Sequence, residues 1–272
     1  MNSYFTTFKI NDHIYQIKEK MGVLATLVIG REKAMLIDTG YGIYNLKEYI
    51  SNITNLPLIV IASHGHMDHT GGNYLFDEIY IHKKDIELCQ KHNSIDRRTR
   101  NINAAIALNC LPDNFNKDKY LQQGSGNLKT VEYGAIFDLG GITIEVINME
   151  GHTAGSIGLY IKEDNYLVVT DATCPFIWIF LEESLSVATY IKMLENVLTL
   201  PFTDILVGHG KGALMKRERV LEFLKVAKEI DMNKAVKVSF QNFENANSYC
   251  YTEGIMYNQD HSGIVFDPNK LK

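Results

Sequence analysis

Residues 58–72 read LIVIASHGHMDHTGG and place several polar side chains directly behind a short apolar run. The run at 58–62 has the length and composition of a buried strand. The polar side chains that follow it within six residues are His64, His66, Asp68 and His69. Rings separated by one residue project to the same side of an extended segment, so the first two histidines can face one ion. Because divalent transition metals accept imidazole and carboxylate together, the stretch predicts a metal-binding loop at a strand end.

Three further groups have the same setting, after an apolar run and beside small residues that let the backbone approach a crowded centre. They are His152 in EGHTAGS, Asp171 in VVTDA and His209 in VGHGK. We expect them to join the first four, because chemistry in α/β proteins gathers at the C-terminal ends of strands. Asp38 in LIDTG also follows a buried strand. We expect its carboxylate to hydrogen-bond a ligand or the His64 loop, since metal ligands need such orienting partners.

The chain shows two rounds of strands followed by a helix, and each round delivers candidate ligands from strand ends. Strand-like alternation covers residues 4–37, 130–137, 142–147, 156–161, 166–170, 203–207 and 236–266. Helical periodicity covers residues 45–55, 94–109, 186–198 and 216–230. The polar stretch 112–126 predicts a lid or a surface excursion. We therefore expect a single α/β domain over residues 1–272, with 94–128 as a helical and loop insertion near the active site.

Composition sets the expected partners and compartment. The 272 residues carry a net charge of −5, which argues against a nucleic-acid partner because phosphates need a basic face. Arg97, Arg98 and Arg100 are expected on a solvated helix face. No apolar run approaches the roughly 18 residues that span a bilayer, so we expect a cytoplasmic protein without membrane contact. A homodimer is the base-rate expectation for such a chain.

The cysteines and the remaining histidines are not expected to bind metal. The four cysteines form no C-x-x-C pair and are expected to be reduced, so the ligands are nitrogen and oxygen atoms. Cys174 lies three residues beyond Asp171 and is expected to be a buried inert thiol. The remaining histidines are expected to be surface or structural residues; they are His13, His82, His92 and His261.

The segment HGHMDH at residues 64–69 resembles the H-x-H-x-D-H signature of the metallo-β-lactamase-fold hydrolase superfamily. The downstream groups at 151–153, 170–171 and 208–210 occur in the order of that family, and the resemblance covers about residues 8–212. It implies a four-layered αβ/βα sandwich of two mixed β-sheets flanked by helices, with a dinuclear site at one edge. It implies one metal ion on His64, His66 and His152, and a second on Asp68, His69 and His209. Asp171 would bridge two divalent ions, zinc first, with iron or manganese as alternatives.

The resemblance implies a hydrolase in which a bridging hydroxide attacks a small ester, thioester or lactone. Asp68 would act as the catalytic residue that orients the nucleophile and later protonates the leaving group. The site is similar to those of glyoxalase II-type thioesterases and lactonases, although residues 172–176 lack the tyrosine that lactonases place there. A phosphodiesterase or nuclease of the same fold, a diiron redox enzyme and a metal-stabilised binding module stay open as alternatives. A small-molecule substrate is the expected partner.

Overall fold

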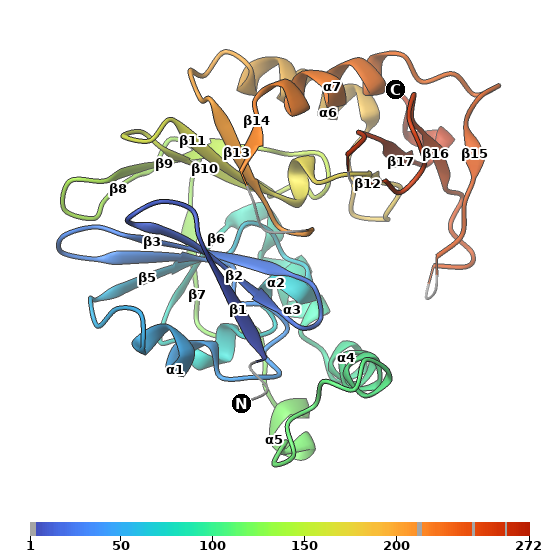
Figure 1. Cartoon of the computed structure of the whole chain (residues 1–272). Helices are drawn as coiled ribbons and strands as arrows, with labels where there is room; N and C mark the ends of the chain where they lie inside the picture. Colours follow the sequence, from blue (N-terminus) through green and yellow to red (C-terminus); the bar gives the residue numbers. More distant parts are fainter. Residues whose placement is uncertain (1–3, 211–213, 241–242, 259) are drawn as a thin grey trace.

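The structure, a computed structural model, describes residues 4–210, 214–240, 243–258 and 260–272. A seven-stranded sheet occupies the N-terminal half, with its strands in chain order (Figure 1). The strands are β1 (Phe5–Lys9), β2 (Ile14–Glu19), β3 (Leu24–Ile29), β4 (Ala34–Ile37), β5 (Leu58–Ile61), β6 (Ile79–His82) and β7 (Leu128–Val131). The first four strands pair antiparallel, and β4 to β7 pair parallel. The parallel strands therefore end at one common edge, where the loop after β5 carries the histidines.

A second mixed sheet of six strands has the order β14-β13-β11-β10-β9-β8. Its strands are β8 (Ile136–Asp138), β9 (Thr143–Asn148), β10 (Ile157–Ile161), β11 (Tyr166–Thr170), β13 (Asp204–Val207) and β14 (Met215–Lys216). The pair of β11 and β13 is parallel, so the segments after these two strands leave the sheet at the same edge. A main-chain hydrogen bond of 2.8 Å from Leu24 to the carbonyl oxygen of Gly208 joins this edge to the first sheet.

The helices lie outside the two sheets, except for a short helix in the metal-binding stretch (Figure 1). They are α1 (Leu46–Ser51), α2 (Met67–Thr70), α3 (Ile86–His92), α4 (Ile95–Ala107), α5 (Lys117–Leu121), α6 (Val187–Val197) and α7 (Glu218–Lys228). The 3-10 turns are η1 (Asn73–Leu75), η2 (Lys83–Asp85), η3 (Asp171–Thr173) and η4 (Pro268–Lys270). The structure describes no helix that is both long and apolar enough to cross a membrane.

Apolar clusters of the described residues fill the space between the layers. The central cluster lies between the two sheets and contains Ile37 of β4 and Leu159 of β10. Leu36, the neighbour of Ile37, belongs instead to the cluster under α1 and α3, because successive side chains of a strand point to opposite faces. Tyr190 of α6 and Phe223 of α7 belong to the third cluster, which covers the second sheet. These layers confirm the predicted αβ/βα sandwich.

The C-terminal region forms a third, four-stranded sheet that the two-sheet expectation did not include. Its order is β12-β17-β16-β15, from β12 (Ile177–Ile179), β15 (Val236–Lys237), β16 (Tyr249–Tyr251) and β17 (Ile264–Phe266). Within the expected strand region 236–266, the strands cover 236–237, 249–251 and 264–266, while residues 241–242 and 259 lie outside the described residues. Because β12 follows the Asp171 turn and pairs parallel with β17, the tail of the chain returns to the edge that carries the candidate site.

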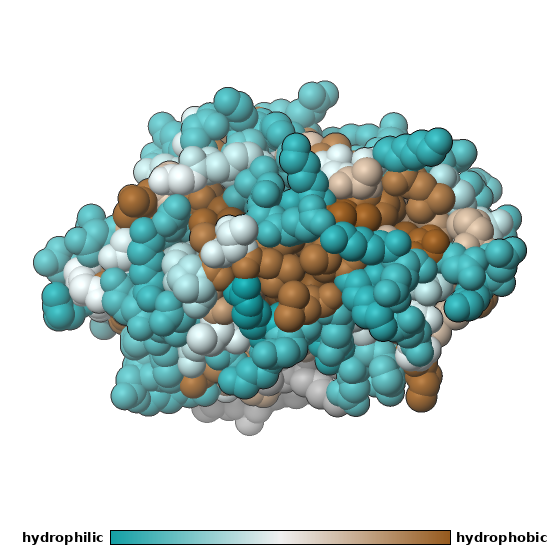
Figure 2. Space-filling model, turned by 90° about the horizontal axis from the view of Figure 1, so that it is seen from above, coloured by the Kyte–Doolittle hydropathy of each residue, from teal (hydrophilic) through white to brown (hydrophobic). Residues whose placement is uncertain are grey.

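The outer face above α6 and α7 is hydrophilic around a central apolar area (Figure 2). Leu221 of α7 is one apolar side chain exposed to solvent.

The helical periodicities predicted at 186–198 and 216–230 are confirmed by α6 and α7.

The assignment of the arginines to a solvated helix face is wrong for Arg98. Helix α4 begins after Ser94, as predicted, but Arg98 is fully buried. Its guanidinium donates hydrogen bonds to the carbonyl oxygens of Gly71 at 3.2 Å and Gly124 at 3.0 Å, and to Asn93 Oδ1 at 2.8 Å. The charge is tolerated because it satisfies buried acceptors beside the metal-binding stretch.

Two predicted segments also differ from the structure. The strand expected at 130–137 is divided between β7 and β8, which belong to different sheets. Gly134 lies between them with φ of +80°, a conformation that favours glycine and turns the chain. The polar stretch 112–126 contains helix α5, which Asn116 caps by accepting a hydrogen bond from the main-chain nitrogen of Lys119.

Candidate metal centre

The seven predicted ligands lie together at one edge of the two sheets, and each follows a strand. They are His64 and His66 between β5 and α2, Asp68 and His69 on α2, His152 after β9, Asp171 after β11 and His209 after β13. Their donor atoms form two groups, in each of which all atoms lie within 4.8 Å of one another. We call them the three-histidine cluster (His64, His66, His152) and the aspartate–histidine cluster (Asp68, His69, Asp171, His209). Their assignment as ligands stays a prediction.

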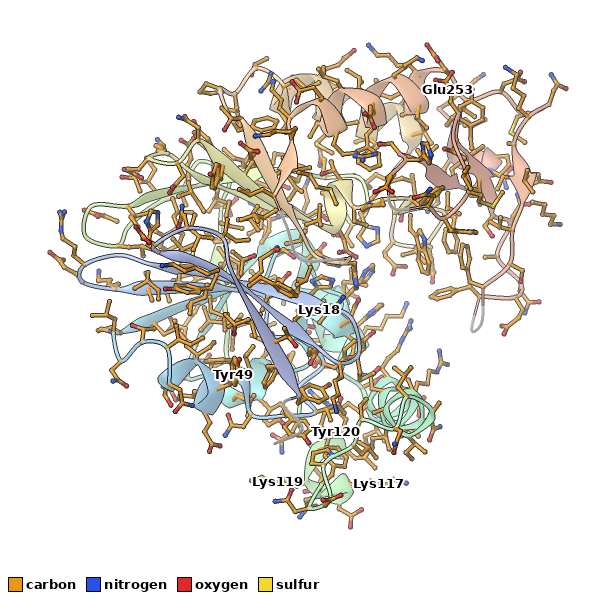
Figure 3. The ribbon with its side chains drawn as sticks, in the orientation of Figure 1. Lys18, Tyr49, Lys117, Lys119, Tyr120 and Glu253 are labelled. Atoms are coloured by element: carbon orange, nitrogen blue, oxygen red, sulfur yellow. The ribbon has the colours of Figure 1, made fainter. Side chains whose placement is uncertain are left out.

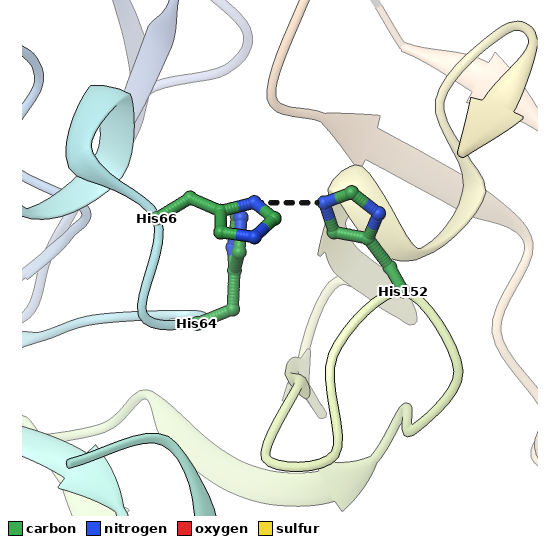
Figure 4. Close-up of side chains that lie close together, drawn as sticks. All are labelled: His64, His66 and His152. Carbon is green, nitrogen blue, oxygen red and sulfur yellow. Dashed lines mark hydrogen bonds between the residues drawn. The ribbon is translucent and has the colours of Figure 1, made fainter. Parts of the chain in front are cut away.

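The rings of the three-histidine cluster lie close together, and those of His66 and His152 face each other (Figure 4). The hydroxyl of Ser63 donates to Asp38 at 2.8 Å, so its oxygen accepts the Nδ1 proton of His64 at 3.0 Å. His64 Nε2 is then a bare acceptor, and this buried atom has no hydrogen-bond partner. A buried nitrogen of this kind requires a partner, and a metal ion fits it.

The other two rings of the cluster are held in the same way. His152 donates its Nδ1 proton to the carbonyl oxygen of Trp178 at 2.8 Å, and His66 donates its Nε2 proton to Glu183 at 2.8 Å. The remaining nitrogens, His66 Nδ1 and His152 Nε2, lie 3.1 Å apart (Figure 4). This contact is a hydrogen bond when one of the two rings carries a second proton; when both rings are neutral, two lone pairs face each other across the gap. A cation between them would resolve that contact, so the residues fit a metal.

Burial keeps the rings of His64 and His152 neutral. It holds the pKa of His64 well below its usual value, and the neighbouring histidines lower it further. Burial, followed by the effect of His66, lowers the pKa of His152 to about 4. Since only a neutral imidazole binds a metal, the cluster is prepared for one at neutral pH.

The aspartate–histidine cluster has the opposite electrostatics. His209 Nε2 lies 3.2 Å from Asp68 Oδ2 and 3.3 Å from Asp171 Oδ2, and His69 Nε2 lies 3.3 Å from Asp171 Oδ1. Burial alone would lower the pKa of His209, but the carboxylates of Asp171 and Asp68 raise it to about 10. Asp171 Oδ2 also lies 3.9 Å from His152 Nε2, which places this carboxylate between the two clusters.

Asp38 connects the clusters from behind. Its carboxylate accepts hydrogen bonds from His69 Nδ1 at 2.6 Å, from the main-chain nitrogen of Ser63 at 2.7 Å and from the hydroxyl of Ser63. Asp38 has φ of 67° and Thr170 has φ of 44°. Such conformations cost about 1–3 kcal/mol for residues other than glycine and concentrate at functional sites. Gly208 leaves room for the centre, because a Cβ there would lie 2.5 Å from Asp171 Oδ1.

Several supporting residues were not identified from the sequence. Asp85 accepts hydrogen bonds from the main-chain nitrogens of Gly65 at 2.8 Å and Gly155 at 2.7 Å, and from Thr153 Oγ1 at 2.6 Å. This carboxylate therefore fastens the His64–His66 loop to the His152 loop. No local pattern distinguishes Asp85 or Glu183 from surface acids, so only their distant partners reveal them.

His92 and Cys174 take different positions near the cluster. The ring of His92, expected to be a surface or structural residue, is buried and stacks on His66 with centroids 4.8 Å apart. His92 Nε2 lies 3.6 Å from Glu183. Cys174 is partly buried, and burial holds the pKa of its thiol well above the usual value, so the thiolate is disfavoured.

Comparisons with known proteins bear on the family and the fold of the chain. Residues 20–209 match the family model of the metallo-beta-lactamase superfamily. The chain is 27% identical over 176 residues to the acyl-coenzyme A thioesterase MBLAC2 of Bos taurus, with 60% of this chain and 62% of that protein covered. The match thus spans less than two thirds of that relative. This chain is also 23% identical over 197 residues to the probable metallo-hydrolase YqgX of Bacillus subtilis, with 68% of this chain and 84% of that protein covered.

Solved structures share the fold. A metallo-beta-lactamase from Pontibacter korlensis superposes with a TM-score of 0.59 at 17% identity, and the superposition covers 83% of this chain and 100% of that one. The DIM-1 metallo-beta-lactamase superposes with a TM-score of 0.60 at 13% identity, covering 83% of this chain and 98% of that one. These identities show the fold alone. Because the family model matches residues 20–209, most of this chain, the chain belongs to the metallo-beta-lactamase superfamily.

Proposed function

We propose that the protein is a dinuclear metal-dependent hydrolase of a small ester-like substrate, with a thioester as the first choice. The observation that carries the proposal is the set of converging nitrogens in the three-histidine cluster, with His64 Nε2 buried and unpartnered, beside two carboxylates. Family membership supports hydrolysis. The MBLAC2 relatives, named acyl-coenzyme A thioesterases, direct the choice to thioesters, although they match over only part of their length.

In this proposal, His64, His66 and His152 hold one divalent ion, and Asp68, His69 and His209 hold a second, with Asp171 in contact with both. Ions bound by these residues would lower the pKa of a bound water to near neutral and would polarise the carbonyl oxygen of the substrate. Nitrogen and oxygen ligands of this kind suit zinc, with manganese or iron as alternatives.

The protein side chains divide the remaining work. Asp68 has a partly exposed side chain, so it can orient the attacking oxygen and carry its proton to the leaving group. Asp38 and Glu183 hold the rings of His69 and His66 in the required tautomers. In the overall reaction, water adds to the carbonyl carbon and the carbon–sulfur bond breaks. The products are a carboxylic acid and a thiol.

Further parts of the proposal rest on the sequence. We include a single domain over residues 1–272, with 94–128, which contains α4 and α5, as an insertion near the site. We also include a small-molecule substrate, a cytoplasmic location and a homodimer. Size-exclusion chromatography with light scattering tests the dimer.

A substrate panel with metal analysis on the same sample tests the function. The panel contains p-nitrophenyl esters, lactones, acyl thioesters and bis-p-nitrophenyl phosphate. We expect hydrolysis of thioesters or esters and about two zinc ions per chain. Turnover of the phosphodiester alone would replace the proposal with a phosphodiesterase. Two irons that undergo reversible reduction would replace it with a redox enzyme.

A further inference from the structure

A pocket of 260 Å³ opens beside His209, on the side of the third sheet. Apart from His209, the residues that line it carry no charge; they are Pro175, Phe176, Trp178, Gly210, Phe240 and Tyr257. Sites for drug-sized ligands measure about 300–1,000 Å³, so this pocket suits one small apolar group of a substrate rather than a whole charged molecule.

Aromatic rings in mutual contact form the wall of the pocket. The ring centroids of Trp178 and Phe240 lie 4.6 Å apart, and those of Phe176 and Tyr257 lie 5.2 Å apart. Behind them, Phe180 stacks on Phe240 with centroids 5.4 Å apart. Trp178 and Phe240 are only partly buried and Tyr257 is exposed, so ring surface is free to contact an apolar ligand.

The pocket is fixed relative to the candidate metal centre through Trp178. The carbonyl oxygen of Trp178 accepts the Nδ1 proton of His152 at 2.8 Å, while its indole lines the pocket. One residue of β12 therefore orients a proposed ligand and builds the wall. Phe176 and Tyr257 have φ of 59° and 60°, strained conformations for residues other than glycine. Strain at two residues of one pocket is typical of a functional site.

We propose that this aromatic pocket binds the apolar acyl chain of a thioester substrate and limits its length. The inference rests on the proposed function, which places the carbonyl carbon at the metal centre next to His209. The acyl chain then occupies the pocket, and the thiol carrier lies outside it, because every lining side chain other than the proposed ligand His209 is uncharged. Hydrolysis breaks the bond between acyl carbon and sulfur, takes up one water, and leaves the acid in the pocket and the thiol outside.

A second and larger cavity provides the control. It measures 710 Å³ and is lined by residues that include Tyr49, Phe115, Lys119 and Tyr120. Three of these are labelled in Figure 3, at the end of the molecule near α1 and α5, far from Glu253 beside the third sheet. Tyr49→Ala therefore removes an aromatic ring from a cavity outside the proposed acyl pocket.

The first test uses the fact that Trp178 is the single tryptophan of the chain. Intrinsic fluorescence of the zinc-loaded protein is recorded during titration with acetate, butyrate, hexanoate and decanoate, which stand in for the acid product. We expect a fluorescence change whose half-saturation concentration falls as the chain lengthens and then rises once the chain exceeds the pocket. A response independent of chain length, or no response, would overturn the acyl pocket.

The second test is kinetic and compares acetyl and hexanoyl thioesters. The quantity compared is the KM for the hexanoyl thioester divided by the KM for the acetyl thioester. We expect Phe240→Ala to raise this ratio about tenfold, because losing apolar contacts in a binding pocket changes substrate discrimination by about that factor. We expect Tyr49→Ala to leave the ratio within about twofold, because its ring lines a separate cavity and distant sites act independently. An equal ratio in both variants would contradict the inference. Tyr257→Ala, at an exposed lining residue, repeats the test if Phe240→Ala does not fold.

The two tests separate the inference from the proposed function. Thioester hydrolysis without chain-length dependence and without a tryptophan response would reject the pocket and keep the hydrolase. A chain-length-dependent tryptophan response in a protein that cleaves no ester or thioester would reject the hydrolase and keep an apolar carboxylate site.

Discussion

The two ligand clusters share one edge of the fold but differ in charge and in the way their rings are held. The three-histidine cluster contains no carboxylate of its own, and its rings donate to a hydroxyl, a carbonyl oxygen and the partly exposed Glu183. The aspartate–histidine cluster contains two carboxylates, and its His69 ring is held by the fully buried Asp38.

The comparison shows how similar ligands reach different states through their surroundings. Burial dominates where only imidazoles meet, so the pKa of His152 falls to about 4. Nearby carboxylates dominate where they are present, so the pKa of His209 rises to about 10. In the metal-free protein, protonated imidazoles thus balance the carboxylates of one cluster, while the other keeps bare nitrogens. Substitutions should affect the two clusters separately.

The largest effect is expected for Asp68→Asn. Loss of a carboxylate that orients the nucleophile and moves a proton should lower kcat by about 10²–10⁴-fold. The three-histidine cluster should keep its ion, which metal analysis of the same sample checks. Asp77→Asn, at a side chain that is 99% exposed, serves as the control. Unchanged turnover in Asp68→Asn would remove this residue from the mechanism.

Asp38→Asn should come next. The asparagine cannot replace the buried carboxylate that accepts from His69 and Ser63, so metal affinity should fall by about 10–100-fold. We expect the loss mainly at the aspartate–histidine cluster, measured by competition with a chromogenic chelator. An equal loss at both positions would mean that Asp38 acts on His64 through Ser63 as strongly as on His69.

Glu183→Gln should have a smaller effect, on the three-histidine cluster. Its side chain is 22% exposed, so water can replace part of the lost hydrogen bond to His66, and affinity should fall by about tenfold. The neighbouring Glu182, with a side chain that is 89% exposed, offers the matched control Glu182→Gln. Equal affinities of the two variants in the chelator titration would show that Glu183 does not orient His66.

The smallest effect concerns Glu19, behind the aspartate–histidine cluster. Burial raises the pKa of this carboxyl to about 8 from an ordinary 4.5, even though it accepts a hydrogen bond from the main-chain nitrogen of Tyr41 at 2.8 Å. Between these two values the folded state binds more protons than the unfolded state, so the Glu19 contribution to stability falls as pH rises. Glu19→Gln removes that dependence.

The matching measurement is a thermal melt at two pH values. Glu19→Gln should have a Tm close to that of the unmodified protein near pH 5 and a higher Tm at pH 8.5. Glu87→Gln, at an exposed residue, should show no such divergence. A Glu19→Gln variant that is less stable at both pH values would contradict a raised pKa and indicate that the carboxylate is the stable form.

The supporting contacts of the site illustrate what sequence reasoning could not supply. Glu183 is 117 residues from His66, and Asp85 is 70 residues from Gly155. Neither residue has a neighbour in the sequence that marks its role, because the packing of separate layers creates the contact. Packing of separate layers also explains the error at Arg98. Its helix has a polar pattern, but its guanidinium donates hydrogen bonds to buried carbonyl oxygens of distant segments.

The sequence by itself determined the layered α/β fold, the family resemblance and the set of candidate ligands at strand ends. These properties are local, since strand periodicity, turn glycines and ligand spacing act over a few residues. Only the tertiary structure decided which nitrogen of each histidine faces the centre, that a third sheet lies beside it, and that an aromatic pocket opens next to His209. Those features depend on side chains brought together from distant segments, where burial and charge act through space rather than along the chain.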